Sequence, residues 1–208
     1  MGRVRSIESS ALVVVDMQNA FLDPDVGFRY APAAGEIVEP INALAHEFRS
    51  AGAPVVWVQT TSRPERGDWP SLRHLIGDPA MDFRAGVLAP GSHGQALWPG
   101  MAARDEDERV LKYRYSAMIE PDGQLERFLD RRGLSTIFVA GTQTNICCES
   151  TARDAMMRGY QAHLVADCLA AETPELHQGA LASFESGFGQ VVVSDELRRA
   201  AQLGRQRT

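Results

Sequence analysis

Three side chains whose chemistry could combine into a catalytic group follow three different apolar runs of the sequence. Asp16 ends the first run, Lys112 ends a later one, and Cys147 lies in the turn after a third. A thiol attacks as its thiolate, so it requires a base to take its proton and benefits from a nearby cation. Each residue alone has a plain structural explanation: a turn cap for Asp16, a solvated lysine for Lys112 and a buried filler for Cys147. Together they indicate nucleophilic catalysis by a cysteine.

The elements that must position these side chains are short β-branched runs that alternate with longer helical patterns. Strands are expected at 11–15, 54–59, 109–111, 136–140, 162–166 and 190–193. Helices are expected at about 34–50, 121–132, 145–158, 174–186 and 194–202. Apolar strands separated by helices favour a parallel sheet that is covered by helices on both faces. The chain is therefore expected to form a single α/β domain over residues 1–208.

Binding sites in open parallel sheets form beyond the carboxyl ends of the strands. Five parts of the chain lie at such ends of the expected strands: Asp16, the segment 59–61, Lys112, the segment 141–147 and Asp167. A carboxylate, an ammonium group and a thiol from distant parts of the chain are thus expected at one edge of the sheet. A helix that begins just beyond the thiol adds exposed N–H groups and partial positive charge.

Two of the three cysteines, Cys147 and Cys148, are adjacent. Successive helical residues point about 100° apart, so both thiols cannot face one site. Cys147 is nearer the turn and is the expected nucleophile, whereas Cys148 is expected to pack against the sheet. A vicinal redox pair is the weaker alternative, because the two-residue spacer of thioredoxin-type motifs is missing. Cys168 is interpreted as structural.

The stretch 61–107 is rich in proline, glycine and tryptophan and breaks the alternation of strands and helices. Long irregular segments in compact domains are usually functional, so this one is expected to shape a pocket. Phe21, Trp69, Trp98 and Tyr115 are the aromatic side chains expected to wall a narrow substrate pocket, with ordinary core packing as the alternative for each. Tyr115 is the one expected to touch the substrate.

Three motifs resemble the isochorismatase-like cysteine hydrolase family: VVVDMQNAF at 13–21, LKYRYSAM at 111–118 and GTQTNICCESTARDAMMRGY at 141–160. The resemblance covers most of the chain in the family's order. It implies a three-layer α/β/α fold with a six-stranded parallel sheet in the order 3-2-1-4-5-6. It also implies an Asp–Lys–Cys triad, which falls on Asp16, Lys112 and Cys147.

The resemblance further implies how such a triad works. The aspartate takes the thiol proton, the thiolate attacks an amide-type carbonyl, and water then cleaves the resulting thioester. A cis peptide bond that is characteristic of the family falls at Thr142–Gln143. The backbone N–H groups of Gln143 and Cys147 would then form the oxyanion hole.

Branches of the family differ in features that the sequence shows. Isochorismatases proper lack the cysteine, so Cys147 argues against them. Nicotinamidases carry an Asp-x-His…His metal site, but here Asp68 and His74 lack that spacing, and no metal or cofactor is expected. The third motif is most similar to the branch of ureidoacrylate amidohydrolase, biuret hydrolase and N-carbamoylsarcosine amidase. Met118 departs from the pattern, since an aromatic residue is common there.

Composition narrows the expected partners and location. The net charge is −6 and no basic stripe is present, so nucleic acid is not expected as a partner. The apolar run 11–15 is too short for a signal peptide or a membrane span, and three cysteines form no disulfide framework. A cytoplasmic protein is expected. The resemblance adds a homo-oligomer, either a dimer or a tetramer, with a small amide or ureide as substrate.

The leading hypothesis is a metal-independent cysteine amidohydrolase that cleaves a C–N bond of a small ureide, carbamoyl compound or carboxamide. An amidase for an aromatic or cyclic carboxamide, similar to nicotinamidase, is the alternative among enzymes. A thiol redox sensor or binding module on the same fold is the alternative from another class. The presence of both Asp16 and Lys112 disfavours the sensor hypothesis, because a redox sensor requires no aligned base and lysine.

Overall fold

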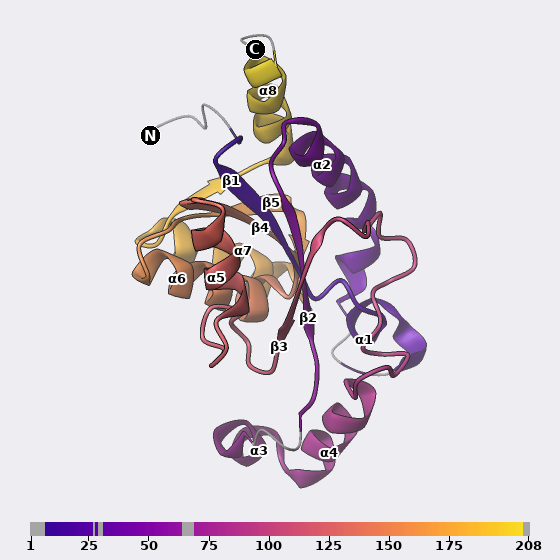
Figure 1. Ribbon diagram of the computed structural model, residues 1–208. Helices are drawn as coiled ribbons and strands as arrows, with labels where there is room; N and C mark the ends of the chain where they lie inside the picture. Colours follow the sequence, from indigo (N-terminus) through magenta and orange to yellow (C-terminus); the bar gives the residue numbers. More distant parts are fainter. Residues whose placement is uncertain (1–6, 27, 29–30, 64–68, 206–208) are drawn as a thin grey trace.

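The computed structural model describes residues 7–26, 28, 31–63 and 69–205 of the chain. Asp68 and the N-terminal residues 1–6 therefore lie outside the described residues. Within them, six strands form one parallel sheet (Figure 1): β1 (Ser10–Val15), β2 (Val55–Thr60), β3 (Glu108–Lys112), β4 (Thr136–Thr142), β5 (Gln161–Ala170) and β6 (Gln190–Val192). Their order in the sheet is β3-β2-β1-β4-β5-β6, which confirms the predicted topology.

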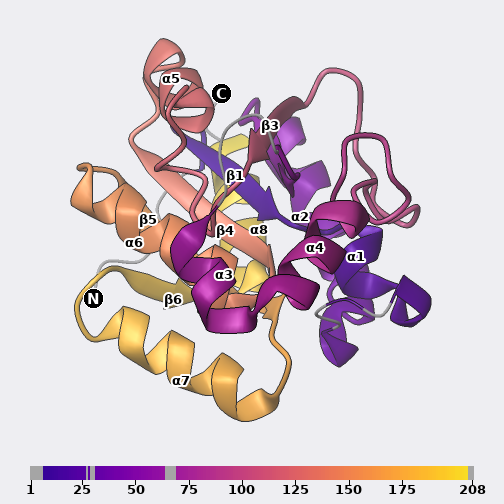
Figure 2. The ribbon, with the colours of Figure 1, turned by 90° about the horizontal axis from the view of Figure 1, so that it is seen from below.

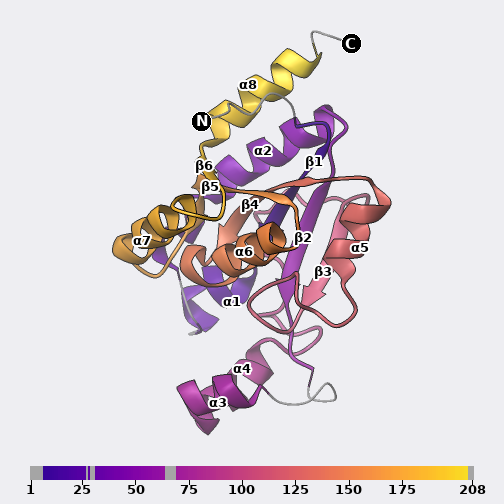
Figure 3. The same ribbon diagram turned by 90° about the vertical axis from the view of Figure 1, so that its left-hand side faces the viewer.

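Helices cover both faces of this sheet (Figures 1 and 3). The α-helices of the described residues are α1 (Asn19–Leu22), α2 (Val38–Ser50), α3 (Pro70–Ile76), α4 (Asp78–Val87), α5 (Gln124–Arg131), α6 (Glu149–Met157), α7 (Pro174–Glu185) and α8 (Ser194–Arg205). Of these, α3 and α4 lie beyond one end of the sheet. Two 3₁₀ turns, Pro24–Val26 and Pro32–Gly35, precede α2, and a π-helical turn, Thr144–Cys148, leads into α6. None of the described helices is long and apolar enough to cross a membrane.

The central strand β1 is buried on both faces because its side chains alternate between two core clusters. Leu12 and Val14 pack in the cluster that includes α2 and α8. Ala11, Val13 and Val15 pack in the cluster that includes α5, α6 and α7. The three-layer α/β/α arrangement follows from this, since a strand that is apolar on both faces must be covered from both sides.

The carboxyl ends of β1 and β4 meet closely enough that one position accepts only glycine. A Cβ atom on Gly141 would lie 2.0 Å from the carbonyl oxygen of Val15, and Gly141 has a φ of 111°. Next to it, the Thr142 hydroxyl donates a hydrogen bond of 3.0 Å to the carbonyl oxygen of Asp16. Asp16 itself has a φ of 53°. The turn after β4 is thereby held against the residue that ends β1.

The stretch 61–107 contains two helices that the sequence analysis did not predict. Proline stands in the first turn of both, at Pro70 in α3 and Pro79 in α4, where its missing N–H and restricted φ suit a helix start. Gly77, with a φ of 84°, separates them. Viewed from below, α3 and α4 lie in front of the carboxyl ends of the strands (Figure 2). They form a cap over the edge at which the site was predicted.

Other predicted boundaries also differ from the structure, and two of these differences matter most. The helix expected from 34 begins at Val38, after the 3₁₀ turn Pro32–Gly35. The fifth strand continues to Ala170, so Asp167 lies within β5 and not at its end. Asp167 accepts hydrogen bonds from the Ser194 N–H at 2.8 Å and from its hydroxyl at 2.6 Å. It therefore anchors the start of α8 and belongs to the structural framework.

Candidate active site

A buried ion pair lies where β1 and β3 end. The ammonium nitrogen of Lys112 is 2.8 Å from a carboxylate oxygen of Asp16, and both side chains are 0% exposed. Thr60, at the end of β2, donates to Asp16 from its backbone N–H and its hydroxyl, each at 3.0 Å. The Lys112 ammonium also donates to the Thr60 hydroxyl oxygen and to the Arg114 carbonyl oxygen. Partners on three strands thus satisfy both charges, as a buried pair requires.

The thiol of Cys147 completes this cluster from the turn after β4. Its sulfur lies 3.3 Å from the Lys112 ammonium nitrogen, and the residue is 7% exposed. Cys147 belongs to the π-helical turn Thr144–Cys148, whose first N–H groups have no carbonyl partner one turn earlier within the helix. The structure therefore brings together Asp16, Lys112 and Cys147, which are far apart in the sequence.

Electrostatics assign the proton in the resting site to the thiol. Burial is the main cause that raises the pKa of Cys147 to about 12. The positive charge of Lys112 lowers this pKa, whereas the negative charge of Asp16 and its hydrogen bond with the thiol raise it further. Burial by itself would lower the pKa of Lys112, but the negative charges of Asp16 and Cys147 raise it overall. At neutral pH the site therefore holds a protonated thiol, which is hydrogen-bonded to Asp16, beside a charged lysine.

The neighbouring Cys148 faces away from the site. It is fully buried, and its sulfur lies 3.9 Å from the carbonyl oxygen of Ala140 in β4. Burial raises the pKa of Cys148 well above the ordinary value of a thiol. Cys168 is buried in the core cluster on the opposite face of the sheet. The two adjacent cysteines thus occupy different environments, as the rotation between successive helical residues requires.

The turn that carries Cys147 has the backbone form that the resemblance implied. The Thr142–Gln143 peptide bond is cis. The Gln143 carbonyl oxygen accepts from the N–H groups of Ile146 at 3.1 Å and Cys148 at 3.2 Å, so the turn is closed around it. Gln143 and Cys147 both line the pocket described next, with their N–H groups in this turn.

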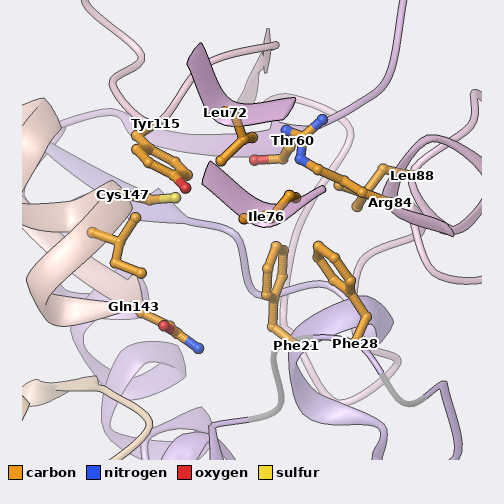
Figure 4. Close-up of a pocket in the computed structure, with 11 residues that line it drawn as sticks. Phe21, Phe28, Thr60, Leu72, Ile76, Arg84, Leu88, Tyr115, Gln143 and Cys147 are labelled. Atoms are coloured by element: carbon orange, nitrogen blue, oxygen red, sulfur yellow. The ribbon is translucent and has the colours of Figure 1, made fainter. Parts of the chain in front are cut away.

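A cavity of about 470 Å³, including its open mouth, lies over the cysteine (Figure 4). Its lining consists of Phe21, Phe28, Thr60, Leu72, Ile76, Arg84, Leu88, Tyr115, Gln143, Ile146 and Cys147. Most of the walls are aromatic or aliphatic. A few polar side chains lie among them, Tyr115 and Gln143 on the side of Cys147 and Thr60 and Arg84 opposite (Figure 4), and could orient a small substrate over the sulfur.

The four predicted aromatic residues have different positions in the structure. Phe21 and Tyr115 line the cavity. Trp69 packs edge-on against Tyr115, with ring centroids 4.7 Å apart, and supports the wall from behind. Trp98 is placed elsewhere: its backbone N–H donates to the Met17 carbonyl oxygen, and its ring packs against the core cluster that includes α2. The prediction that it walls the pocket does not match this position.

Residues of the stretch 61–107 line the cavity, as expected, but the sequence did not indicate which ones. Leu72 and Ile76 come from α3, and Arg84 comes from α4. Short helices with interrupted apolar patterns give little signal in sequence, and an arginine within one would be read as solvated. Met118, which departs from the family pattern, is buried in the core cluster beside α5 and is absent from the cavity lining.

A metal site is the feature that would separate this chain from nicotinamidase-like enzymes. Among the described residues, no three His, Cys, Asp or Glu side chains are grouped so that they could hold a metal ion. His74 lies on α3, and Asp68, the other residue considered for such a site, is outside the described part of the chain.

A parallel sheet in this order, with a buried Asp–Lys–Cys cluster at its carboxyl edge, has the architecture of an α/β cysteine hydrolase. The model of the isochorismatase domain matches residues 10–196. The chain therefore belongs to the isochorismatase family, as the sequence motifs predicted.

Comparison with individual proteins agrees with this assignment. The chain is 32% identical to ureidoacrylate amidohydrolase RutB from Methylorubrum extorquens, over 92% of this chain and 86% of the relative. It is 29% identical to nicotinamidase 3 from Arabidopsis thaliana, over 92% of this chain and 88% of the relative. A crystal structure of a cysteine hydrolase from Pseudomonas syringae pv. phaseolicola 1448A superimposes with a TM-score of 0.86 at 28% identity, covering 98% of this chain and 99% of that one. By name, the first of these relatives is an amidohydrolase and the second is a nicotinamidase.

Proposed function

We propose that this protein is a metal-independent cysteine amidohydrolase that cleaves a C–N bond of a small ureide, carbamoyl compound or carboxamide. The observation that carries the proposal is the position of one ammonium group between a thiol and a carboxylate. Lys112 lies 2.8 Å from Asp16 and 3.3 Å from the sulfur of Cys147, which lines the cavity. This arrangement supplies a nucleophile, a base and a fixed positive charge.

In the first half of the reaction, Asp16 accepts the thiol proton while the Cys147 sulfur forms a bond to the carbonyl carbon. The electron pair of the C=O π bond moves to the oxygen, which accepts hydrogen bonds from the backbone N–H groups of Gln143 and Cys147. Lys112 offsets the negative charge that would otherwise develop on buried sulfur. Each of these groups acts on charge that appears only in the transition state, which is where stabilisation accelerates a reaction.

In the second half, the tetrahedral intermediate collapses and the C–N bond breaks. Asp16 returns its proton to the leaving nitrogen, which departs as ammonia or an amine and leaves a thioester on Cys147. Water then attacks the thioester carbon, with Asp16 as the base that takes its proton. The carbon–sulfur bond breaks, the sulfur regains the proton, and the acid product leaves. The site is restored without any change in oxidation state.

An aromatic or cyclic carboxamide is the second candidate substrate. The rings of Phe21 and Phe28 lie 5.7 Å apart on the cavity wall and offer an apolar surface for a flat ring. The similarity to nicotinamidase 3 supports the same alternative. A redox-sensor role is less well supported, because sensor thiols are exposed and have a low pKa. Cys147 is buried, and burial raises its pKa to about 12.

Ammonia release from a panel of small amides tests the proposal. The panel should contain terminal ureides, N-carbamoyl amino acids, short aliphatic carboxamides and nicotinamide. The wild type should release ammonia from at least one ureide or carbamoyl compound, and Cys147→Ala should not. Cys148→Ala is the matched control, since it removes the adjacent thiol that faces the sheet. Turnover of nicotinamide alone would favour the second candidate, and full activity of Cys147→Ala would overturn the mechanism.

A further inference from the structure

Arg84 is a buried cation within the cavity that the reaction above does not use. It lies on α4, is 8% exposed and lines the pocket across from Cys147 and Tyr115 (Figure 4). In the part of the chain that the structure describes, its guanidinium has no hydrogen-bond acceptor and no ion-pair partner. Buried charges are normally paired, so a buried guanidinium that faces a cavity calls for a ligand.

The described protein groups around Arg84 leave its charge uncompensated. The Trp69 ring lies 5.8 Å from the guanidinium carbon, and the Arg114 guanidinium is 5.0 Å from the same ring, so this neighbour adds another cation. Burial lowers the pKa of Arg84, while the acidic groups of Cys147, Tyr115 and Asp16 counter this from across the cavity. A guanidinium keeps its charge in proteins even so.

Carboxylates near Arg84 are already engaged by other cations. Asp16 is paired with Lys112 at 2.8 Å. The α4 side chains Asp78 and Asp82 lie at the exposed surface, where both contact Arg73, at 2.6 Å and 3.4 Å. An anion that enters the cavity would therefore find one buried guanidinium with its donors available, and no described carboxylate that competes for them.

We propose that Arg84 binds a carboxylate of the substrate, so that the enzyme acts on small acids with a terminal carbamoyl or carboxamide group. This inference rests on the proposed amidohydrolase function and specifies its substrate class. A planar guanidinium matches a carboxylate with two parallel hydrogen bonds, which fixes orientation as well as affinity. The carbonyl to be attacked would lie over Cys147 at the other side of the cavity, with aliphatic walls from Leu72, Ile76 and Leu88 along a short linker.

A different role for Arg84, direct stabilisation of the Cys147 thiolate, makes different predictions. In that case Arg84→Gln would lower kcat equally for acidic and neutral amides and would shift the pH dependence of the reaction. A carboxylate-binding role confines the loss to acidic substrates and places most of it in KM, because the contact is already made in the bound ground state. Paired substrates therefore separate the two roles.

The experiment compares N-carbamoyl amino acids with their methyl esters, by ammonia release, in wild type, Arg84→Gln, Arg84→Lys and Arg73→Gln. Arg73→Gln is the matched control, since it removes an arginine from the same helical cap at a more exposed position. For the acids, Arg84→Gln should lower kcat/KM by about 10- to 100-fold, the value of one charge-assisted contact. The esters should change little. Arg84→Lys should recover part of the loss, because it keeps the charge without the planar fork.

Binding to the inactive Cys147→Ala protein separates this inference from the proposed function. By calorimetry, an N-carbamoyl amino acid should bind Cys147→Ala but not Cys147→Ala/Arg84→Gln, whether or not the wild type hydrolyses it. Thermal unfolding checks that both proteins are folded. Equal binding by the two proteins, or equal loss for acids and esters in the kinetic comparison, would overturn the role of Arg84. Binding without hydrolysis by the wild type would contradict only the proposed function.

Discussion

Replacing Lys112 with methionine tests whether a single buried charge holds the site together. The side chain is 0% exposed and contacts Asp16 at 2.8 Å, Cys147 at 3.3 Å and the hydroxyl oxygen of Thr60. Methionine fills a similar volume, but it donates no hydrogen bond and carries no charge. The Asp16 carboxylate would remain buried without a cation, with only the donors of Thr60 and the Cys147 thiol to stabilise it.

The size of the effect follows from the cost of leaving a buried charge without its partner, about 3–5 kcal/mol. Unfolding entropy is about 2.1 cal/mol/K per residue, so a chain of 208 residues changes Tm by about 1 °C for every 0.44 kcal/mol. Lys112→Met should therefore lower Tm by about 7–11 °C. Amide hydrolysis should fall by about 10⁴-fold, as when one member of a cooperating catalytic group is removed.

Thermal unfolding and initial rates measure these two effects, with Asp16→Asn/Lys112→Met as the matched variant. The double substitution removes both charges, so it should be inactive but more stable than Lys112→Met by several kcal/mol. If Lys112→Met unfolds at the wild-type temperature, the ion pair does not stabilise the protein. If the double variant is the less stable of the two, Asp16 and Lys112 contribute independently and the reasoning is wrong.

Three further predictions concern pH, metals and assembly. Because burial raises the pKa of Cys147 to about 12 and raises that of Cys148 well above 9.0, these thiols stay protonated in the folded protein while they ionise in the unfolded chain. Their contribution to stability is complete below about pH 9 and is lost as pH rises toward the folded pKa, by about 1.4 kcal/mol per pH unit for each thiol. Denaturant unfolding at pH 8 and 10 should show a smaller loss for Cys148→Ala than for wild type; equal losses would contradict the burial argument. Turnover should survive exhaustive chelation, and a requirement for added zinc or iron would exclude the metal-independent mechanism. The protein should form a dimer or tetramer in light scattering. The cap should contribute to the interface, because Leu75 is 75% and Phe83 49% exposed there. Leu75→Glu should weaken assembly, and a measured mass of 22.8 kDa, that of one chain, would contradict the prediction.

The sheet could be predicted from the sequence because its strands are short, apolar throughout and separated by helices. The order of the strands came from the family resemblance, since apolar patterns do not specify which strands are neighbours. The end of β5 was misjudged because the polar Asp167 interrupts an apolar run, although it remains in the strand and binds Ser194. A side chain that caps a distant helix looks like the end of a strand when only local sequence is considered.

The candidate catalytic cluster could be located because strand ends in a parallel sheet share one edge, which places Asp16, Lys112 and Cys147 together. The cap could not be predicted in the same way. Its helices are short, and whether Arg84 faces solvent or the cavity depends on how α4 packs, which the sequence does not encode locally. Trp98 shows the reverse error: an aromatic residue in an irregular segment was assigned to the pocket, but its ring packs against the core cluster.

The central claim is that Cys147, and not Cys148, forms a thioester with the substrate. Acid quench during turnover of the fastest substrate in the amide panel, followed by mass spectrometry, measures this directly. Tryptic cleavage after Arg132 and Arg153 leaves both cysteines on one peptide, so fragmentation between them must locate the added acyl mass. We predict one acyl group on Cys147, none on Cys148, and an unmodified peptide from Cys147→Ala. An acyl group on Cys148, or turnover by Cys147→Ala, would contradict the account.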